Sequence, residues 1–479
     1  MSAPTIERPT VVKRTRQPVR PRHAPSPPPL APNQDQRPRL HRAVVVLLVS
    51  WVMPVQFYVG AQRLTPYRAA LLLLFIPCLV WLARGRAGRM RLPDILLVLF
   101  SAWSMISLVV IHGAGGIQTG GIAVLETLTP YFLARCCIRT ADDFYALARA
   151  LTAIVAVLLP FALYEAFTGH NLYLEIASRI FPSIGITDKD PRWGLRRVQL
   201  FFEHPILMGV CCGSVLALTQ MVVGREQSFT RRWAQSGVVF LTAALSLSSG
   251  PLSGLMVQLA LMSWNRALGW LRARWTLLIV LIGAFVLTVE LFAKRPLPNI
   301  LLSFAFDPDS AFFRIVIWNY GTLSVANHPL FGVGMGSWDR PSWMAPSIDM
   351  FWLYNAITYG LPGGVLMLGF FAVACLTVGR TPNLSPRHYD YRTAYLIAMA
   401  SFFLTGWMVH FWNGTYVFFL FMVGAGIWIR DVAEAQPRTM PPEQTRHSGV
   451  RGAQPRRTER LLDGKLEPIE RQSRRGRHR

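Results

Sequence analysis

The sequence predicts an all-α integral membrane protein that crosses the bilayer repeatedly. Its 479 residues are 52% hydrophobic and only 15% charged, and the mean hydropathy is +0.33. The apolar residues gather in runs of about 20, the length that an α-helix needs to cross the hydrocarbon core. A soluble protein of this size would carry more charge and shorter apolar runs, so a polytopic membrane protein is indicated.

The apolar runs divide residues 43–430 into about twelve crossings, with a long external loop between helices 9 and 10. Helices 7 and 8 are separated only by the short segment SSGPLSG. The expected crossings are 43–60, 66–83, 93–112, 120–138, 143–168, 205–224, 234–249, 251–267, 275–293, 350–378, 393–412 and 415–430.

The basic residues between the apolar runs predict the orientation. Arginines gather in alternate connections, whereas intervening short connections such as HGAGGIQTG and HFWNGTY contain no Lys or Arg. By the positive-inside rule the arginine-rich side is cytoplasmic, and an even number of crossings then leaves both termini inside. Residues 169–204 and 294–349 become the two long external loops. The arginine-rich connections are 84–91, 139, 225–232, 266–274 and 380–392.

Residues 1–42 and 431–479 are predicted to be disordered, basic cytoplasmic tails that flank the membrane domain. They are rich in Arg, Pro, Gln and Ser and contain few large apolar residues with which to form a core. Their charge either binds anionic lipid headgroups or only fixes the orientation. The formal net charge of +24 arises largely from these tails and the short loops, so it favours membrane topology over nucleic-acid binding. The first apolar run is expected to remain as a signal anchor.

Cysteine usage predicts neither a disulfide framework nor a metal site. All the cysteines lie inside apolar runs, where we expect them to pack as small apolar side chains. No cofactor and no metal are implied. The six positions are Cys78, Cys136, Cys137, Cys211, Cys212 and Cys375.

The two long loops hold nearly all the external basic residues. Long loops obey the positive-inside rule weakly, so these charges are either simply solvated or form an anion site between the loops. Arginine suits the second interpretation, because its planar guanidinium grips phosphate oxygens with two parallel hydrogen bonds. The residues are Arg179, Lys189, Arg192, Arg196 and Arg197 in the first loop, and Lys294, Arg295, Arg314 and Arg340 in the second.

The most informative stretch is 312–364, which is predicted to face outward. It begins with an amphipathic helical segment that carries Arg314 and is stopped by His328-Pro329. Glycines at 332, 334 and 336 follow, and a polar segment then leads to Asp349 at the entrance of another apolar run.

This series of residues resembles the O-antigen ligase and polymerase superfamily. The matched residues are Arg314, Trp318, His328-Pro329-Leu330, Gly332, Gly334 and Gly360-Leu-Pro-Gly363. A second stretch, GLRRVQLFFEHPILMG at 194–209, is similar to the arginine-bearing loop that precedes a membrane helix in that family. The resemblance implies a glycosyltransferase in the bacterial inner membrane that takes glycan from an undecaprenyl-diphosphate carrier at the outer face. Chain-length regulators and export proteins become candidate partners.

The resemblance also implies roles for particular residues. Arg314 and either Arg196 or Arg197 would hold the diphosphate, in place of a metal, and His328 is a candidate for substrate binding. The alternative for Arg196 and Arg197 is ion pairing with Glu203, Asp188 or Asp190. His204 and His328 each precede a proline, so either could instead cap a helix boundary.

Asp349 departs from the ligase pattern. In the ligases that this sequence resembles, the polar residue about ten positions ahead of Gly-x-x-Gly is a histidine, whereas an aspartate is typical of the polymerases. Asp349 is therefore our candidate base, able to accept a proton from an acceptor sugar hydroxyl if burial raises its pKa. The alternative is a helix N-terminal acid that the backbone dipole stabilises. Met350 leaves the match to the polymerases incomplete.

Three other functions stay open at this stage. An O-antigen ligase would use the same donor with a different acceptor, and an acyl- or phosphotransferase could also act on surface glycans. A flippase or other transporter needs charged residues deep in the membrane, for which Glu126, Glu165 and Glu290 are the candidates. A serine hydrolase is not indicated, because Ser248, Ser249 and Ser253 have no histidine and acid at suitable positions.

Overall fold

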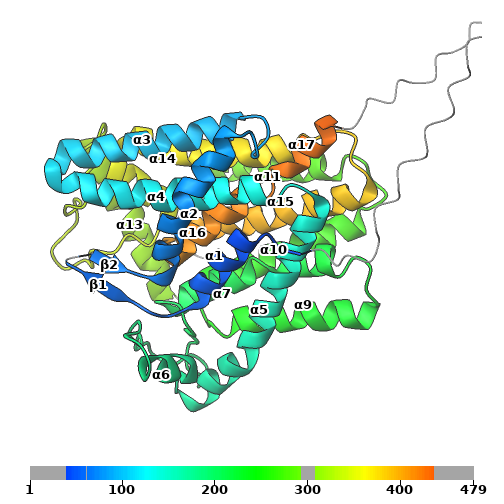
Figure 1. Ribbon diagram of the computed structural model, residues 1–479, viewed down its shortest axis with the longest axis horizontal. Coiled ribbons are helices and arrows are strands. Elements are labelled where there is room, and N and C mark those ends of the chain that lie inside the picture. The colour runs from blue at the N-terminus through cyan, green and yellow to red at the C-terminus, as the bar shows by residue number, and fades with distance from the viewer. Residues whose placement is uncertain (1–38, 61, 293–307, 436–479) are drawn as a thin grey trace, which may run out of the picture. The chain divides into compact units, whose positions relative to one another are not determined.

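A computed structural model describes residues 39–60, 62–292 and 308–435 (Figure 1). The predicted tails lie almost wholly outside these residues, so their predicted disorder stays a prediction. The described residues are mostly helical, and their one sheet is a two-stranded hairpin. The all-α expectation is therefore confirmed except at that hairpin.

The elements follow one another along the chain with few long gaps. They are α1 (Arg42–Val52), β1 (Phe57–Val59), β2 (Gln62–Leu64), α2 (Pro66–Ala83), α3 (Leu92–His112), α4 (Ala114–Cys137), α5 (Ala141–Thr168), α6 (Leu172–Ser178), α7 (Pro205–Gly213), α8 (Leu216–Leu218), the π-helix η1 (Thr219–Val223), α9 (Phe229–Ala244), α10 (Ser249–Ala267), α11 (Arg274–Phe292), α13 (Pro308–Asn327), α14 (Phe351–Gly379), α15 (Pro386–Gly406), α16 (Gly414–Gly424) and α17 (Trp428–Ala435).

Seven helical segments among the described residues are long and apolar enough to cross a membrane. Helices also form at the other predicted crossings, but α1 and α9 are shorter and α4, α10 and α15 are less apolar. The seven segments are Pro66–Ala83, Leu92–His112, Ala141–Thr168, Pro205–Val223, Arg274–Phe292, Phe351–Gly379 and Gly414–Glu434.

The first predicted crossing, 43–60, is wrong in its second half. The helix α1 ends at Val52, Pro54 follows, and the chain then turns back through β1 and β2 around Gly60, whose φ is +62°. Proline cannot continue a helix, and the run Phe-Tyr-Val favours a strand. The hairpin segment also joins the first long loop, because the Gln56 N–H donates to the Pro182 carbonyl at 2.9 Å.

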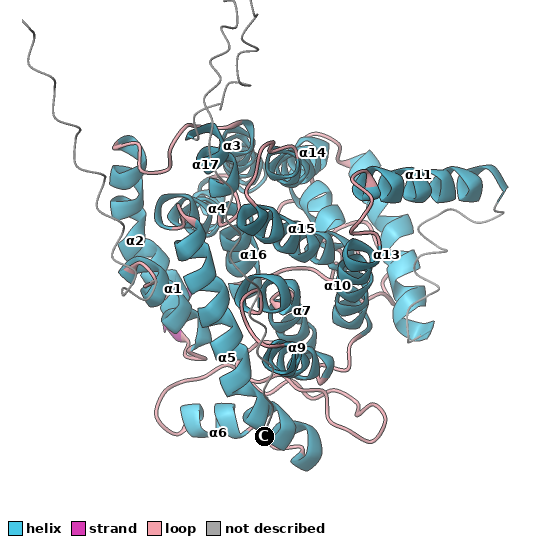
Figure 2. Ribbon diagram, turned by 90° about the vertical axis from the view of Figure 1, so that its right-hand side faces the viewer, coloured by secondary structure: helices cyan, strands magenta, loops and turns pink. Residues whose placement is uncertain are grey.

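The apolar segment Pro205–Val223 lies at the centre of the fold, with 94% of its residues buried. Figure 2 shows α7, α15 and α16 near the middle of the helices, with α2 and α3 toward the outside. The outer helices α2 and α3 instead expose large apolar side chains, among them Leu73, Ile76 and Val110. This arrangement suits a surface that contacts lipid.

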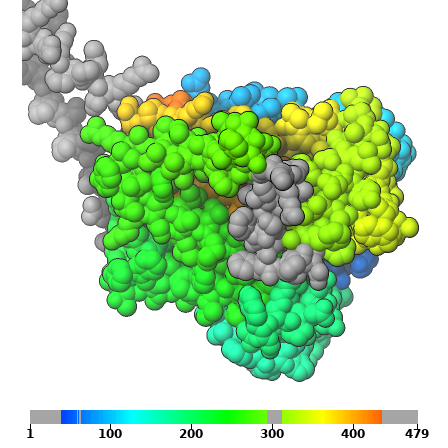
Figure 3. Space-filling view, turned by 180° about the vertical axis from the view of Figure 1, so that it is seen from behind, coloured from blue at the N-terminus to red at the C-terminus, as the bar shows by residue number. Residues whose placement is uncertain are grey.

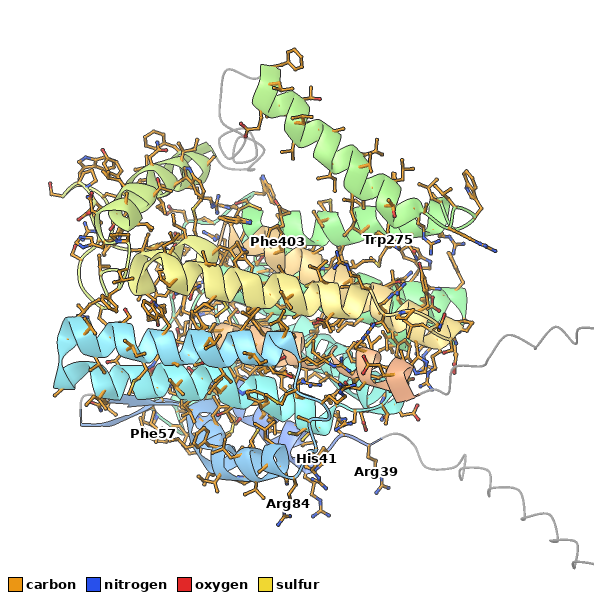
Figure 4. All side chains as sticks on the ribbon, turned by 90° about the horizontal axis from the view of Figure 1, so that it is seen from above. Arg39, His41, Phe57, Arg84, Trp275 and Phe403 are labelled. Atoms are coloured by element: carbon orange, nitrogen blue, oxygen red, sulfur yellow. The ribbon has the colours of Figure 1, made fainter. Side chains whose placement is uncertain are left out.

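The helix α11 has no buried residue, and Figure 4 shows it standing away from its neighbours beyond Trp275. Figure 3 shows the face formed by α9, α10 and α11 in green, beside α13 and its following loop in yellow-green.

The second long loop contains the helix α13, and this helix ends at Asn327 directly before His328-Pro329, as predicted. The following chain lies against α14 through backbone contacts. The N–H groups of Val333 and Gly334 donate to the carbonyls of Ile357 and Thr358 at 2.9 Å. Gly332 and Gly360 meet here, and a Cβ on Gly332 would lie 2.5 Å from the Gly360 nitrogen. The glycines of this motif therefore permit a close backbone approach.

The helix ends that are predicted to be cytoplasmic contact one another. Ion pairs join Arg225 to Asp390 at 2.9 Å and Arg387 to Asp142 at 2.6 Å. Arg135 of α4 is fully buried and binds both Asp94 and Asp431, at 3.1 and 3.0 Å. These ion pairs stabilise a buried charge that would be strongly destabilising without a partner.

The ends that are predicted to be external also contact one another, for example through the ion pair between Arg63 and Glu203 at 2.5 Å.

Labelling of introduced cysteines tests the predicted orientation. We expect a membrane-impermeant thiol reagent to label Ser178→Cys and Ser347→Cys in intact spheroplasts, and Arg86→Cys and Ser228→Cys only after lysis, because arginine-rich connections stay in the cytoplasm. All four positions are exposed, and the native cysteines are buried or half-buried, which gives a low background. Labelling of Ser228→Cys before lysis would overturn the orientation.

Candidate functional site: an arginine cluster at the start of α10

The candidate site is built around residues 247–249, where the chain turns from α9 into α10. Leu247 has a left-handed backbone with φ of +46°, Ser248 is the N-cap residue, and Ser249 is the first residue of the helix. The N-terminus of a helix carries unpaired N–H groups and a partial positive charge, so it favours an anion nearby.

Three arginines from the two long loops converge on this turn. Arg192 donates from Nη1 to the Leu247 carbonyl at 2.9 Å, and Arg197 donates from Nη2 to the Ser248 Oγ at 2.8 Å. Arg314 of α13 reaches the adjacent Ser249, with 3.5 Å between Nη2 and Oγ. We call Arg192, Arg197 and Arg314 the arginine cluster. Residues more than a hundred positions apart in the sequence thus place their guanidinium groups around one helix start.

Arg314 also links the cluster to the start of α14. Its side chain is buried, with 6% exposed, and Nε donates to the Met408 carbonyl at 3.1 Å. The next residue, Val409, accepts a hydrogen bond from the Phe351 N–H at 3.2 Å. The backbone that binds Arg314 therefore also fixes the first turn of α14, immediately after Asp349.

Asp349 is half-buried and lies within electrostatic range of Arg314 and Lys189. Burial raises the pKa of its carboxyl above the ordinary value, and the positive charges of Arg314 and Lys189 oppose that shift. The N-cap residue of α14 is Met350, and this cap has no side-chain hydrogen bond. Among the described residues, no donor is hydrogen-bonded to the Asp349 carboxylate. The carboxylate thus lacks the hydrogen bond that a capping acid would make.

Arg196 and Arg197 have different surroundings, so the structure distinguishes two residues that the sequence left equivalent. Arg197 joins the cluster, whereas Arg196 lies near Glu165 and favours its negative charge. Glu165 also accepts hydrogen bonds from the N–H groups of Gln199 and Leu200, at 2.8 and 3.0 Å. Glu203, one of the three acids considered as alternative partners, binds Arg63 and Asn413.

In the transfer reaction that the sequence resemblance implies, we expect Arg197→Ala to reduce the rate much more than Arg196→Ala. The loss of one charge-assisted contact costs about 1.5–3 kcal/mol, or roughly ten- to a hundredfold, and only Arg197 lies in the cluster. The measurement is the initial rate with a lipid-linked donor for the two purified variants. An equal loss in both would show that the loop needs positive charge rather than one particular arginine.

Among the described residues, neither of the two candidate histidines is hydrogen-bonded to the arginine cluster. His204 caps α7, since its Nδ1 accepts from the Ile206 N–H at 3.2 Å, and burial with the nearby Arg197 and Lys189 lowers its pKa to about 4. His328 is exposed and lies 3.7 Å from Asp339. It follows Arg314 by 14 residues, or roughly 21 Å along a helix. The structure therefore does not bring His328 to Arg314, and its substrate contact stays a prediction.

A cavity of about 230 Å³ lies beside the first turns of α14. It is lined by Phe351 at the start of α14 and by His410, which follows the backbone bound to Arg314. The His410 ring lies 3.9 Å from the Tyr354 ring, measured between centroids, and its buried Nδ1 has no hydrogen-bond partner among the described residues. We did not predict His410 as a site residue. The one sequence signal for it was the polar connection HFWNGTY.

The three acids considered for a transport path have separate surroundings in the structure. Glu126 binds Arg68 at 2.6 Å, Glu165 binds loop N–H groups, and Glu290 lies on an exposed surface of α11. Within the part of the chain that the structure describes, no group of three His, Cys, Asp or Glu side chains could hold a metal ion.

Comparison of the sequence with models of known protein families and with characterised proteins gives no match.

Proposed function

We propose that the chain is a membrane glycosyltransferase that elongates a polysaccharide from an undecaprenyl-diphosphate carrier at the outer face of the inner membrane. In this proposal the chain crosses the membrane twelve times and keeps both termini in the cytoplasm. The observation that carries the proposal is the convergence of Arg192, Arg197 and Arg314 on the start of α10, beside the half-buried Asp349.

The arginine cluster suits the diphosphate of the donor. Guanidinium groups bind phosphate oxygens with charge-assisted hydrogen bonds, and the α10 N-terminus adds a partial positive charge. As the bond between the sugar's anomeric carbon and the phosphate oxygen breaks, negative charge grows on the leaving diphosphate. Fixed cations at that position stabilise the transition state more than the ground state.

Asp349 is the proposed base. The acceptor hydroxyl forms the new bond to the anomeric carbon, its proton passes to the Asp349 carboxylate, and polyprenyl diphosphate leaves. The raised pKa of Asp349 lies nearer to the working pH, and a general base is most effective when its pKa is close to that pH. The cavity beside the first turns of α14 suits the acceptor, because aromatic faces such as Tyr354 pack on sugar rings while Asn355 and His410 offer polar contacts.

The acid at 349 favours a polymerase over the ligase alternative, which has a histidine at this place in the proteins that the sequence resembles. The transporter alternative receives less support, because Glu126 and Glu165 already have fixed partners.

The test uses the purified full-length protein in lipid nanodiscs with a carrier-linked repeat unit. We expect longer carrier-linked glycan and one free polyprenyl diphosphate for each unit added. Movement of the intact donor across a vesicle membrane, without any release of polyprenyl diphosphate, would favour the transporter instead.

A further inference from the structure

A second basic region lies at the opposite end of α10. A cavity of about 520 Å³ opens between η1, α9, α10 and the start of α15. Arg266 lines it near the C-terminal end of α10, 17 residues beyond Ser249 and hence roughly 25 Å from the arginine cluster along the helix. We call this space the basic cavity. It takes no part in the proposed transfer reaction.

The charges that line the basic cavity do not balance. Arg225 is paired with Asp390 at 2.9 Å. Arg232 and Arg266 also line the cavity, and within the described residues neither side chain has an ion pair or a hydrogen bond. Arg266 lies within electrostatic range of Arg232 and disfavours its charge, while Asp390, already paired with Arg225, favours it. The buried Nε of Arg232 has no hydrogen-bond partner in the described chain. Two like charges that face one space are stabilised when an anion lies between them.

The glycine at position 224 leaves the space in which the Arg232 side chain lies. The aliphatic stem of Arg232 packs across Gly224, where an added Cβ would lie 2.6 Å from the Arg232 Cγ. Gly224 directly follows the π-helix η1, whose residues Gln220 and Met221 line the same cavity. Short π-helices are rare and occur frequently at functional sites.

The rim of the basic cavity is apolar and aromatic. Phe229 and Trp233 line it and are 74% and 49% exposed, and Met262 contributes a further apolar side chain. Aromatic side chains of this kind are enriched where a membrane meets water. The arginines therefore offer an anion site directly beside a surface suited to hydrocarbon.

We propose that the basic cavity binds the phosphate headgroup of an anionic lipid, with Arg232 and Arg266 contacting the phosphate and with Phe229 and Trp233 contacting the chains. The site lies at the predicted cytoplasmic end of the helices, so the lipid comes from the inner leaflet. This inference is independent of the glycosyltransferase proposal, because it uses none of the same residues.

The test compares lipid binding by the full-length protein and by arginine variants. Native mass spectrometry of protein released from mixed phosphatidylglycerol and phosphatidylcholine nanodiscs counts the bound lipids. We expect the double variant Arg232→Gln/Arg266→Gln to retain phosphatidylglycerol at least about tenfold less than the wild type. Arg231→Gln is the matched control, because Arg231 is an exposed neighbour outside the cavity lining. We expect it to stay within about twofold.

Two outcomes would overturn the inference. An equal loss in Arg231→Gln would show that general surface charge holds the lipid. Displacement of phosphatidylglycerol by millimolar inorganic phosphate would show that the cavity recognises free phosphate rather than a lipid. If the double variant does not fold, the single variant Arg266→Gln at the exposed end of α10 provides the same comparison.

Discussion

Arg314→Lys is expected to lose nearly as much transfer activity as Arg314→Ala. Lysine keeps the positive charge but cannot reproduce the planar fork, which in the structure spans the Met408 carbonyl and the Ser249 hydroxyl. The loss of one such contact to an ionic group costs about 1.5–3 kcal/mol, or roughly a ten- to hundredfold lower rate. Initial rates with a carrier-linked donor measure the effect.

The matched control is Arg340→Lys in the same loop. Arg340 donates to the nearby Met344 carbonyl at 2.7 Å and lies outside the arginine cluster. We expect its lysine variant to retain activity within about twofold, because a half-buried loop contact contributes little to the reaction. Thermal unfolding of each purified variant separates loss of function from loss of fold. Full activity of Arg314→Lys at normal protein level would show that Arg314 supplies only positive charge.

Asp349→Asn is expected to reduce the transfer rate by about 10²–10⁴-fold, the usual contribution of a positioned base. Asparagine keeps the size of the side chain but cannot accept the proton. The carboxylate has no hydrogen-bond donor among the described residues, so the substitution breaks no hydrogen bond that the structure shows. An active Asp349→Asn enzyme would remove this residue from the mechanism.

The pH dependence gives a second measure of the same role. Burial raises the pKa of Asp349, and the base must be ionised to accept a proton. Activity is therefore complete above the raised pKa and falls as the pH is lowered through it. We expect the acidic limb of the wild-type profile to lie above the ordinary range of an aspartate and to be absent from the residual activity of Asp349→Asn. The same acidic limb in both proteins would assign it to another group.

The sequence predicted a helix boundary correctly where the residues at that boundary themselves begin or end the helix. The helix of the second predicted crossing was expected at 66–83 and is observed at Pro66–Ala83, because Pro66 suits a first helical position and arginines follow the last turn. The end of α13 at Asn327 was predicted from His328-Pro329 in the same way. The first crossing failed at Pro54, because the apolar residues that follow form a hairpin rather than a longer helix.

The candidate site was only partly predictable from the sequence. The arginines of the long loops suggested an anion site, but the choice between Arg196 and Arg197 depends on the local backbone, since neighbouring side chains in an extended segment point to opposite sides. Ser248 and Ser249 carried no signal of their own, because their importance comes from tertiary contacts with Arg197 and Arg314. His410 was missed for the same reason.

Sizing the carrier-linked glycans of a strain that lacks this protein tests the central claim most directly. A polymerase lengthens glycan that is still attached to its carrier, so its loss should leave single repeat units on undecaprenyl diphosphate and no long chains. A gene that encodes the wild-type protein should restore the long chains, and one that encodes Arg314→Ala should not. Long polymer that accumulates on the carrier in the deletion strain would contradict the polymerase and indicate a ligase.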